Sequence, residues 1–142
     1  MKKIVVLSLL ASFFGALPAS AHFQVLYTPE TILDKGGEVP LKLVFTHPFE
    51  AGHTMDMGKP QEFFVVNKEK KTDLLETLAP ITWKSLENEG KAFETTFKLK
   101  GMGDYVFCLV PAPYYEQSEE TYIQQITKMI VNNGSLPTDW DA

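Results

Sequence analysis

The strongest strand signal in the sequence is Val39-Pro40-Leu41-Lys42-Leu43-Val44-Phe45-Thr46-His47, in which every odd-numbered position before His47 is apolar. Alternation with a period of two is typical of a β-strand that buries one face. The stretch Ala92-Phe93-Glu94-Thr95-Thr96-Phe97-Lys98-Leu99 also alternates. After a glycine-rich turn, the apolar run Tyr105-Val106-Phe107-Cys108-Leu109-Val110 indicates a strand that is buried on both faces.

Shorter β-rich segments complete the pattern. Strands are predicted at residues 23–27, 62–67 and 81–83, and a lysine-rich turn follows residue 67. The stretch 122–131 fits a helical face through its three isoleucines, but its β-branched content and its isolated position favour a strand. About seven short strands separated by Gly/Pro turns predict an all-β fold, an antiparallel Ig-like β-sandwich.

The composition argues against nucleic acid as a partner. The 142 residues contain 13 lysines, no arginine and 18 acidic residues, which gives a formal charge of −5. Affinity for nucleic acid comes mainly from cationic contacts to phosphates, which an acidic chain without arginine supplies poorly. Cys108 is the only cysteine, so an internal disulfide is impossible and the stability of the domain must come from a hydrophobic core.

The first 21 residues have the pattern of a secretory signal peptide. Lys2 and Lys3 precede an uncharged apolar run, Ile4–Leu17, and Ala19-Ser20-Ala21 supplies the small residues of a cleavage site. The run is shorter than the roughly 20 residues that span a bilayer. We therefore expect cleavage after Ala21 and a periplasmic β-sandwich domain, residues 22–142, with no membrane span of its own. Because cleavage removes two lysines and no acidic residue, the charge falls from −5 to −7.

The predicted cleavage makes His22 the first residue of the exported chain. Its free α-amino group and its imidazole Nδ1 can then bind one metal ion together. A second imidazole would complete a T-shaped set of nitrogens that suits Cu(II) or Ni(II). His47 and His53 are the candidates for that ligand, because the Pro48–Gly52 loop between them contains turn-forming residues.

The residues near this loop offer further donors. Glu50 and Asp56 carry carboxylates, and Met55 and Met57 carry soft thioethers. Each residue also has an ordinary structural explanation. A histidine in the apolar phase of a strand is commonly a hydrogen-bonded core or rim residue, and two methionines at strand spacing commonly pack in a core. The clustering of these groups beside a terminal chelate is what favours a metal site.

Other chemistries fit the sequence poorly. A zinc site built from CxxC pairs is impossible with one cysteine. The thiol of Cys108 is expected to be inert, because it lies within an apolar strand. The GxSxG motif of a nucleophilic serine does not occur. We therefore expect a protein that is not an enzyme.

Several short motifs follow one another along the chain and resemble a known family. They are Ala21-His22-Phe23-Gln24, Thr46-His47-Pro48-Phe49-Glu50, Met55-Asp56-Met57-Gly58-Lys59-Pro60, Lys71-Thr72-Asp73-Leu74-Leu75, Gly103-Asp104-Tyr105-Val106-Phe107 and Pro111-Ala112-Pro113-Tyr114-Tyr115-Glu116. The chain resembles the NikK-like periplasmic component of ECF-type nickel/cobalt transporters, the nickel-uptake substrate-specific region family. The resemblance implies an exported protein that binds nickel or cobalt and delivers it to an ECF-type permease in the inner membrane.

The resemblance carries over unevenly to individual residues. His22 and His47 fall on recurring motif positions of that family, whereas His53 lies in a variable spacer. Members of the family continue beyond the Asp139-Trp140-Asp141 region into a second β-rich module, and this sequence ends at Ala142. Metal binding is therefore better supported than delivery to a permease.

The leading hypothesis is a non-enzymatic periplasmic carrier that binds Ni(II) through the amine and imidazole of His22, with His47 and His53 as further ligands. Glu50, Met55, Asp56 and Met57 would complete or line the site. Co(II) and Cu(II) are alternative metals. The alternatives in function are a copper-binding protein of the histidine-brace type, either a carrier or an oxidative enzyme, and a metal-free β-sandwich that mediates interactions.

Overall fold

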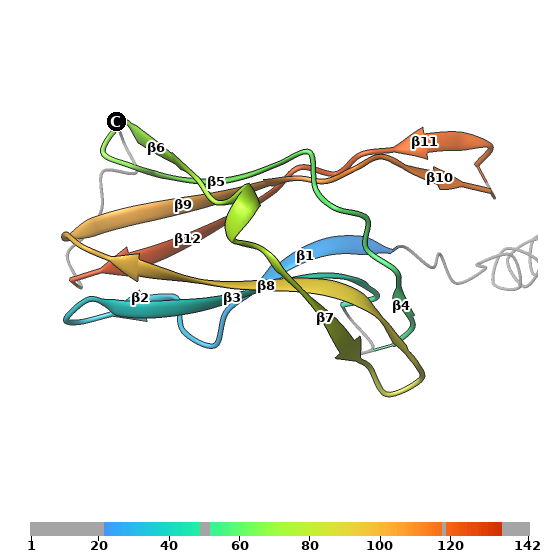
Figure 1. Ribbon diagram of the computed structural model, residues 1–142, viewed down its shortest axis with the longest axis horizontal. Coiled ribbons are helices and arrows are strands. Elements are labelled where there is room, and N and C mark those ends of the chain that lie inside the picture. Colours follow the sequence, from blue (N-terminus) through green and yellow to red (C-terminus); the bar gives the residue numbers. More distant parts are fainter. Residues whose placement is uncertain (1–21, 49–51, 118, 135–142) are drawn as a thin grey trace, which may run out of the picture.

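The computed structural model describes residues 22–48, 52–117 and 119–134 (Figure 1). Its strands are β1 (Phe23–Tyr27), β2 (Ile32–Leu33), β3 (Gly37–Thr46), β4 (Thr54–Met55), β5 (Glu62–Asn67), β6 (Lys70–Asp73), β7 (Ala79–Lys84), β8 (Glu89–Leu99), β9 (Gly103–Val110), β10 (Tyr114–Glu116), β11 (Thr121–Ile123) and β12 (Thr127–Asn133). A 3₁₀ helix, η1 (Leu75–Thr77), connects β6 to β7. Within these ranges no helix is long and apolar enough to cross a membrane. The predicted leader, residues 1–21, and Glu50 lie outside the described residues.

The strands form two packed sheets and a separate hairpin. One sheet has the order β1-β3-β8-β7, with β4 added to β3, and the other has the order β2-β12-β9-β5-β6. The pairings are antiparallel apart from the short parallel contact between β2 and β12. If the seven longest strands are lettered A to G in chain order, the sheets read ABED and GFC, which is the Ig strand order. The predicted all-β, Ig-like sandwich is therefore confirmed.

The seven strands of five or more residues include all those that the alternation predicts. The ambiguous stretch 122–131 is β-structure, but it is divided between β11 and β12 by residues 124–126. The lysine-rich turn is confined to Lys68 and Glu69, both with positive φ, and β6 starts directly after it. Four of the five strands of two to four residues, β2, β4, β6 and β10, have no counterpart in the sequence prediction, because so short a segment carries no measurable period.

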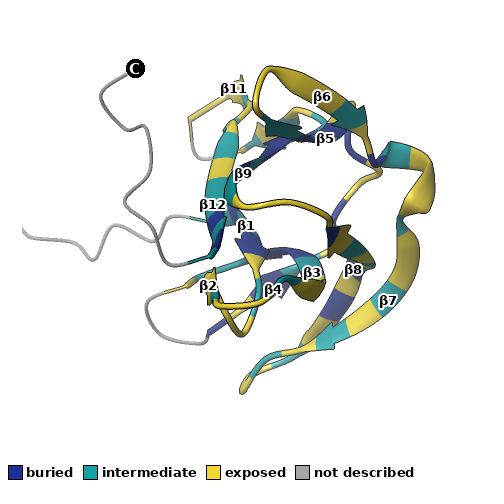
Figure 2. Cartoon of the chain, turned by 90° about the vertical axis from the view of Figure 1, so that its left-hand side faces the viewer, coloured by how far each residue is buried: buried dark blue, intermediate teal, exposed yellow. Residues whose placement is uncertain are grey.

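The core lies between the two sheets, where Figure 2 shows the buried segments facing each other. In β3 the alternating residues Val39, Leu41, Leu43 and Phe45 are at most 3% exposed. They face fully buried side chains of β5, β9 and β12, namely Phe63, Val65, Phe107, Leu109 and Val131. Burial of one such side chain contributes about 1.5–3 kcal/mol, so this interior stabilises the chain without a disulfide.

Cys108 lies on β9 and is a free thiol, 6% exposed. Burial raises the pKa of this thiol, and the positive charges of Lys128 and Lys71 oppose the shift. A thiol with a raised pKa holds less of the reactive thiolate form. The environment of Cys108 therefore agrees with the expectation that it is inert.

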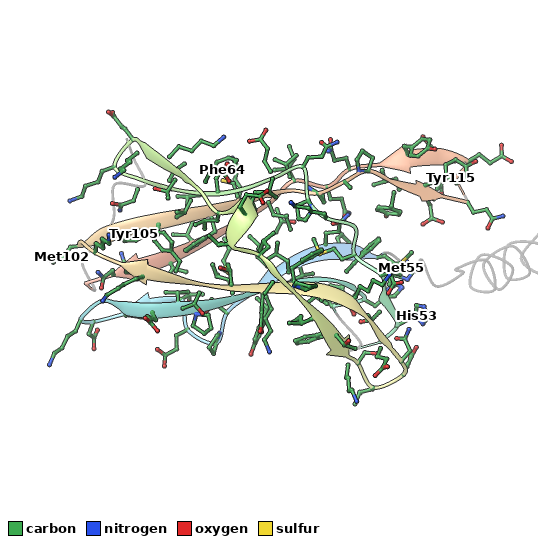
Figure 3. All side chains as sticks on the ribbon, in the orientation of Figure 1. His53, Met55, Phe64, Met102, Tyr105 and Tyr115 are labelled. Atoms are coloured by element: carbon green, nitrogen blue, oxygen red, sulfur yellow. The ribbon has the colours of Figure 1, made fainter. Side chains whose placement is uncertain are left out.

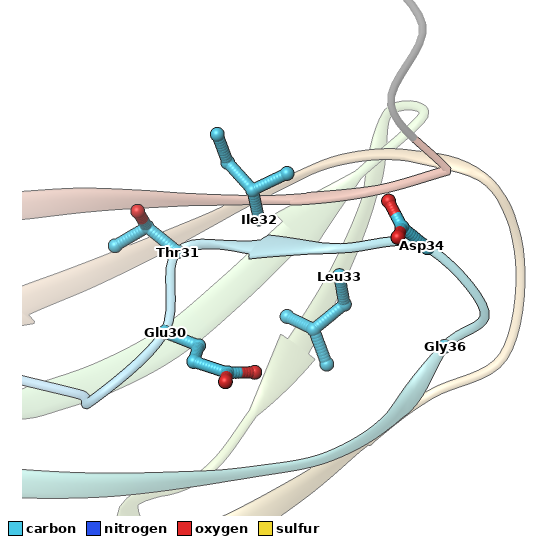
Figure 4. A pocket seen from close by; sticks show the side chains of 6 residues that line it. All are labelled: Glu30, Thr31, Ile32, Leu33, Asp34 and Gly36. Carbon is cyan, nitrogen blue, oxygen red and sulfur yellow. The ribbon is translucent and has the colours of Figure 1, made fainter.

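Open hollows lie on the surface of the described part of the chain. One lies beside β2, has a volume of about 520 Å³ and is lined by residues 30–34 and Gly36 (Figure 4). The carboxylates of Glu30 and Asp34 make it acidic. Another is lined by residues of β5, β6, β8 and β9 and of the turn between β8 and β9.

The turn between β8 and β9 is closed by the hydroxyl of Tyr105. This hydroxyl accepts hydrogen bonds from the backbone N–H groups of Lys100 (3.2 Å) and Gly101 (2.9 Å) and donates one to the carbonyl of Gly101 (3.0 Å). A tyrosine near the start of the sixth main strand whose hydroxyl bonds to the preceding backbone is the tyrosine corner of Ig-like sandwiches. Tyr105 is only 4% exposed, and these three hydrogen bonds are part-buried.

We predict that Tyr105→Phe lowers the free energy of unfolding by about 1–3 kcal/mol, because two part-buried N–H groups lose their acceptor and the carbonyl of Gly101 loses its donor. Urea-induced unfolding followed by tryptophan fluorescence measures the change. Tyr122→Phe is the matched control, since Tyr122 is 72% exposed, and its effect should stay within about 0.5 kcal/mol. Equal stability of the two variants would contradict this role of Tyr105.

Candidate metal centre

Strand register brings the three histidines to one end of one sheet. The last β1–β3 pair is Phe23↔Thr46, so one step further along this antiparallel ladder His22 stands opposite His47. The last β3–β4 pair is Thr46↔Thr54, and the next step places His47 opposite His53. The N–H of His47 donates to the carbonyl of His53 at 3.2 Å, which extends this second ladder. Directly opposed residues point to the same face of a sheet.

The side chains of this histidine row, His22, His47 and His53, lie close together. The ring centres of His22 and His47 are 4.0 Å apart, and those of His22 and His53 are 6.1 Å apart. His47 and His53 are each two positions from Phe45 and its partner Met55, so they lie on the same inward-facing side of the sheet. The histidine row therefore lies at the edge of the core. Figure 3 shows His53 and Met55 together at this end of the sandwich. His22 and His47 are half-buried and His53 is exposed.

The His22 ring is held in a setting that favours its neutral form. Burial lowers the pKa of His22, the charges of His47 and His53 lower it further, and the carboxylate of Glu116 opposes them. Its Nε2 atom is buried and has no hydrogen-bond partner among the described residues. A neutral imidazole with free lone-pair capacity is the form that binds a metal ion.

Strand β4, which starts directly after His53, is anchored by Asn88, the residue before β8, and by Gly90 within β8. The side chain of Asn88 donates from Nδ2 to the carbonyl of Thr54 (2.8 Å) and accepts the N–H of Thr54 at Oδ1 (2.8 Å). Gly90 permits the close approach, because a Cβ there would lie 2.5 Å from the Cγ2 of Thr54 and 3.0 Å from the carbonyl oxygen of Met55. These contacts fix β4, and with it the position of His53.

The other predicted site residues have different surroundings. Met57 is 3% exposed and belongs to the core cluster, and Met55 packs against that cluster. Asp56 is exposed and its carboxylate accepts the N–H of Lys91 at 2.8 Å. The structure thus brings together the histidines with Met55 beside them, and it gives Met57 a packing contact and Asp56 a backbone hydrogen bond. Glu50 lies outside the described residues.

The hairpin β10–β11 adds two residues that the sequence analysis did not assign to the site. The ring of Tyr114 lies 4.7 Å from that of Phe45, which in turn contacts His22 at 5.9 Å. Burial and the charge of Glu116 raise the pKa of Tyr114. Glu116 is two positions further along β10, and its charge also acts on His22. The only sequence signal for this pair is the spacing of two in Tyr114-Tyr115-Glu116.

The described side chains do not form a complete metal site by themselves. In residues 22–48, 52–117 and 119–134, no group of three or more His, Cys, Asp or Glu side chains is arranged so that it could hold a metal ion. A chelate at His22 would add a donor that is not a side chain, the main-chain nitrogen. That nitrogen becomes an amine only if the chain is cleaved after Ala21.

Comparison with known proteins gives a family. The family described as "Domain of unknown function (DUF4198)" matches residues 19–142. The chain belongs to the DUF4198 family. No curated protein and no solved structure matches the chain. The DUF4198 match covers all the described strands and both sheets, and its description names no ligand, metal or activity.

We predict that Gly90→Ala destabilises the protein by about 1–3 kcal/mol, because the added methyl group forces β4 away from β8. Urea-induced unfolding measures the loss, and two-dimensional NMR should show shifts that extend from Gly90 to His53. Gly58→Ala is the matched control, because a Cβ there would meet its nearest neighbour at an ordinary 3.7 Å. If both variants were equally stable, Gly90 would not be the residue that positions this strand.

Proposed function

We propose that the protein is a periplasmic carrier that binds Ni(II), with Co(II) as an alternative cargo, at a chelate formed by the N-terminus and the histidine row. The observation that carries the proposal is the pairing of His22, the predicted first residue of the exported chain, with His47 at a ring-centre distance of 4.0 Å. The motif resemblance to the NikK-like component of ECF-type transporters supports nickel. Delivery to an ECF-type permease rests on that resemblance alone.

The spacing of the rings suggests how the donors would be arranged. A metal–nitrogen bond of about 2.0–2.1 Å places the ion roughly 3.2 Å from the centre of an imidazole ring. Two rings on opposite sides of one ion are then about 6.4 Å apart, and two rings at right angles are about 4.5 Å apart. The 6.1 Å between His22 and His53 suits opposite positions. The 4.0 Å between His22 and His47 is shorter than either spacing, so these rings would have to move apart to bind one ion in adjacent positions, in agreement with the absence of a preformed three-histidine site among the described residues.

This arrangement would leave the fourth corner, opposite His47, to the amine of His22. Four nitrogens in a plane form the tetragonal set that Ni(II) and Cu(II) prefer. The lowered pKa of His22 favours binding, since its imidazole stays neutral at a pH where an ordinary histidine begins to take up a proton. His53 is exposed, so the ion would remain accessible for transfer to a partner.

The same donors would accept copper. Cu(II) binds more tightly than Ni(II) to nitrogen sites of this kind, so relative affinity in vitro does not identify the cellular metal. A histidine-brace copper protein is therefore the alternative function. The soft thioether of Met55, half-buried beside Phe45 and on the same face as the histidine row, is the feature that favours it.

We predict that the form beginning at His22 binds Ni(II) more tightly than a form with one extra N-terminal residue, by about tenfold or more, because the extension converts the amine into an amide. Isothermal titration calorimetry measures both affinities. His47→Ala and His53→Ala should each weaken binding by about tenfold. Met102→Leu, at the end of the sandwich away from the histidine row, is the control and should leave nickel binding unchanged.

The outcomes separate the possible sites. Equal nickel affinity with and without the extension would rule out the terminal chelate. Binding that survives the extension but is lost in His47→Ala would instead indicate a site made of imidazoles, in which the buried Nε2 of His22 is a ligand. Absence of binding by Ni(II), Co(II) and Cu(II) would leave the metal-free interaction domain.

A further inference from the structure

A second pocket lies at the end of the sandwich opposite the histidine row. It has a volume of about 480 Å³ and opens between the edges of the two sheets. Its inner wall is formed by Val65, Phe97 and Tyr105, and three lysines, Lys70, Lys98 and Lys100, line it as well. Figure 3 shows Tyr105 and Met102 far from His53 and Met55, so this pocket is separate from the candidate metal centre.

The pocket lies where the edge strands of the two sheets leave the space between the sheets uncovered. The ladder between β7 and β8 stops at the pair Ala79↔Glu94, so residues 95–99 of β8 pair only with β3. On the opposite sheet, β6 is the edge strand and pairs only with β5. The seam between β6 and the far half of β8 is therefore an open side of the sandwich.

The inner wall of the pocket is apolar and aromatic. Phe97 is only half-buried although it packs in the core, with its ring centre 6.0 Å from that of Tyr105 and 5.7 Å from that of Phe107. The Tyr105 hydroxyl is already engaged by the backbone of residues 100 and 101. The part of Phe97 that its neighbours leave uncovered is a surface on which a flat apolar group can pack.

The rim of the pocket is cationic in an acidic protein. Lys70, Lys98 and Lys100 are exposed, and in the described part of the chain none of them has a salt bridge. None of the described residues that line the pocket is acidic. The neighbouring Lys71 points to the other face of β6, where it lies 3.0 Å from the carboxylate of Glu62. The acidic hollow beside β2 shows the opposite charge at a similar volume.

We propose that this seam pocket binds a small organic anion, a molecule with a flat apolar body and a carboxylate, sulfonate or phosphate group. The body would pack on the uncovered part of Phe97, and the anionic group would lie at the rim, near the ammonium groups of Lys70 and Lys100. Exposed charge pairs contribute little by themselves, so the apolar contact is needed for affinity. The volume is within the range of about 300–1,000 Å³ that is typical of small-molecule sites.

The test compares two fluorescent probes that share an aromatic body, 8-anilinonaphthalene-1-sulfonate and the uncharged N-phenyl-1-naphthylamine. We expect the sulfonate to bind the wild-type protein more tightly than the neutral probe. The variant Lys70→Gln/Lys98→Gln/Lys100→Gln should weaken sulfonate binding by about tenfold and leave the neutral probe unchanged. Lys35→Gln/Lys128→Gln, which removes lysines elsewhere, should behave as wild type, and nickel titration of all forms should be unaffected.

A second measurement locates the probe on the wild-type protein, in case the triple variant folds poorly. Two-dimensional NMR should show sulfonate-induced shifts at Thr72, Phe97 and Gly101. Equal affinity for the two probes, equal sulfonate binding by the triple and control variants, or shifts confined to the separate groove of Tyr27 and Trp83 would overturn the proposal.

Discussion

The antiparallel register of β1, β3 and β4 is the constraint on which the candidate metal centre depends. The pairs Phe23↔Thr46 and Thr46↔Thr54 place the flanking histidines side by side on one face. Because side chains alternate along a strand, a slip of one residue would turn a histidine to the opposite face. Burial of Leu26, Leu43 and Phe45 opposes such a slip, since the same slip would expose them to water. The hydrophobic core therefore fixes the geometry of the polar site.

The two ends of the sandwich differ in chemistry. The histidine row and the half-buried Tyr114 and Glu116 lie at one end, where nitrogen donors gather. At the other end, a pocket opens between β6 and β8, and its lining contains Phe97, Tyr105 and three lysines. A packed Ig-like core between these ends holds both in place, which is the usual division between a rigid scaffold and the groups mounted on its margins. Either site can therefore be altered without the other.

The sequence predicted the scaffold better than the sites. Alternation located β3 and β8, a continuous apolar run located β9, and β-rich composition indicated the other longer strands. It also gave the inward direction of His47, which continues the phase of Phe45. It could not give the partner of each strand, so the contact of His22 with His47 was only one of the possible pairings. The roles of Gly90, Glu116 and the pocket lysines (Lys70, Lys98 and Lys100) could not be predicted from the sequence, because the residues around them come from distant segments.

The central claim is that export exposes an N-terminal histidine whose own nitrogens hold a transition metal. N-terminal sequencing together with metal analysis of the exported protein, purified without chelators, tests it most directly. The account predicts a chain that begins His22-Phe23-Gln24 and carries nickel in proportion to protein. A chain that begins elsewhere, or one that begins at His22 and contains neither nickel nor cobalt nor copper, would contradict it.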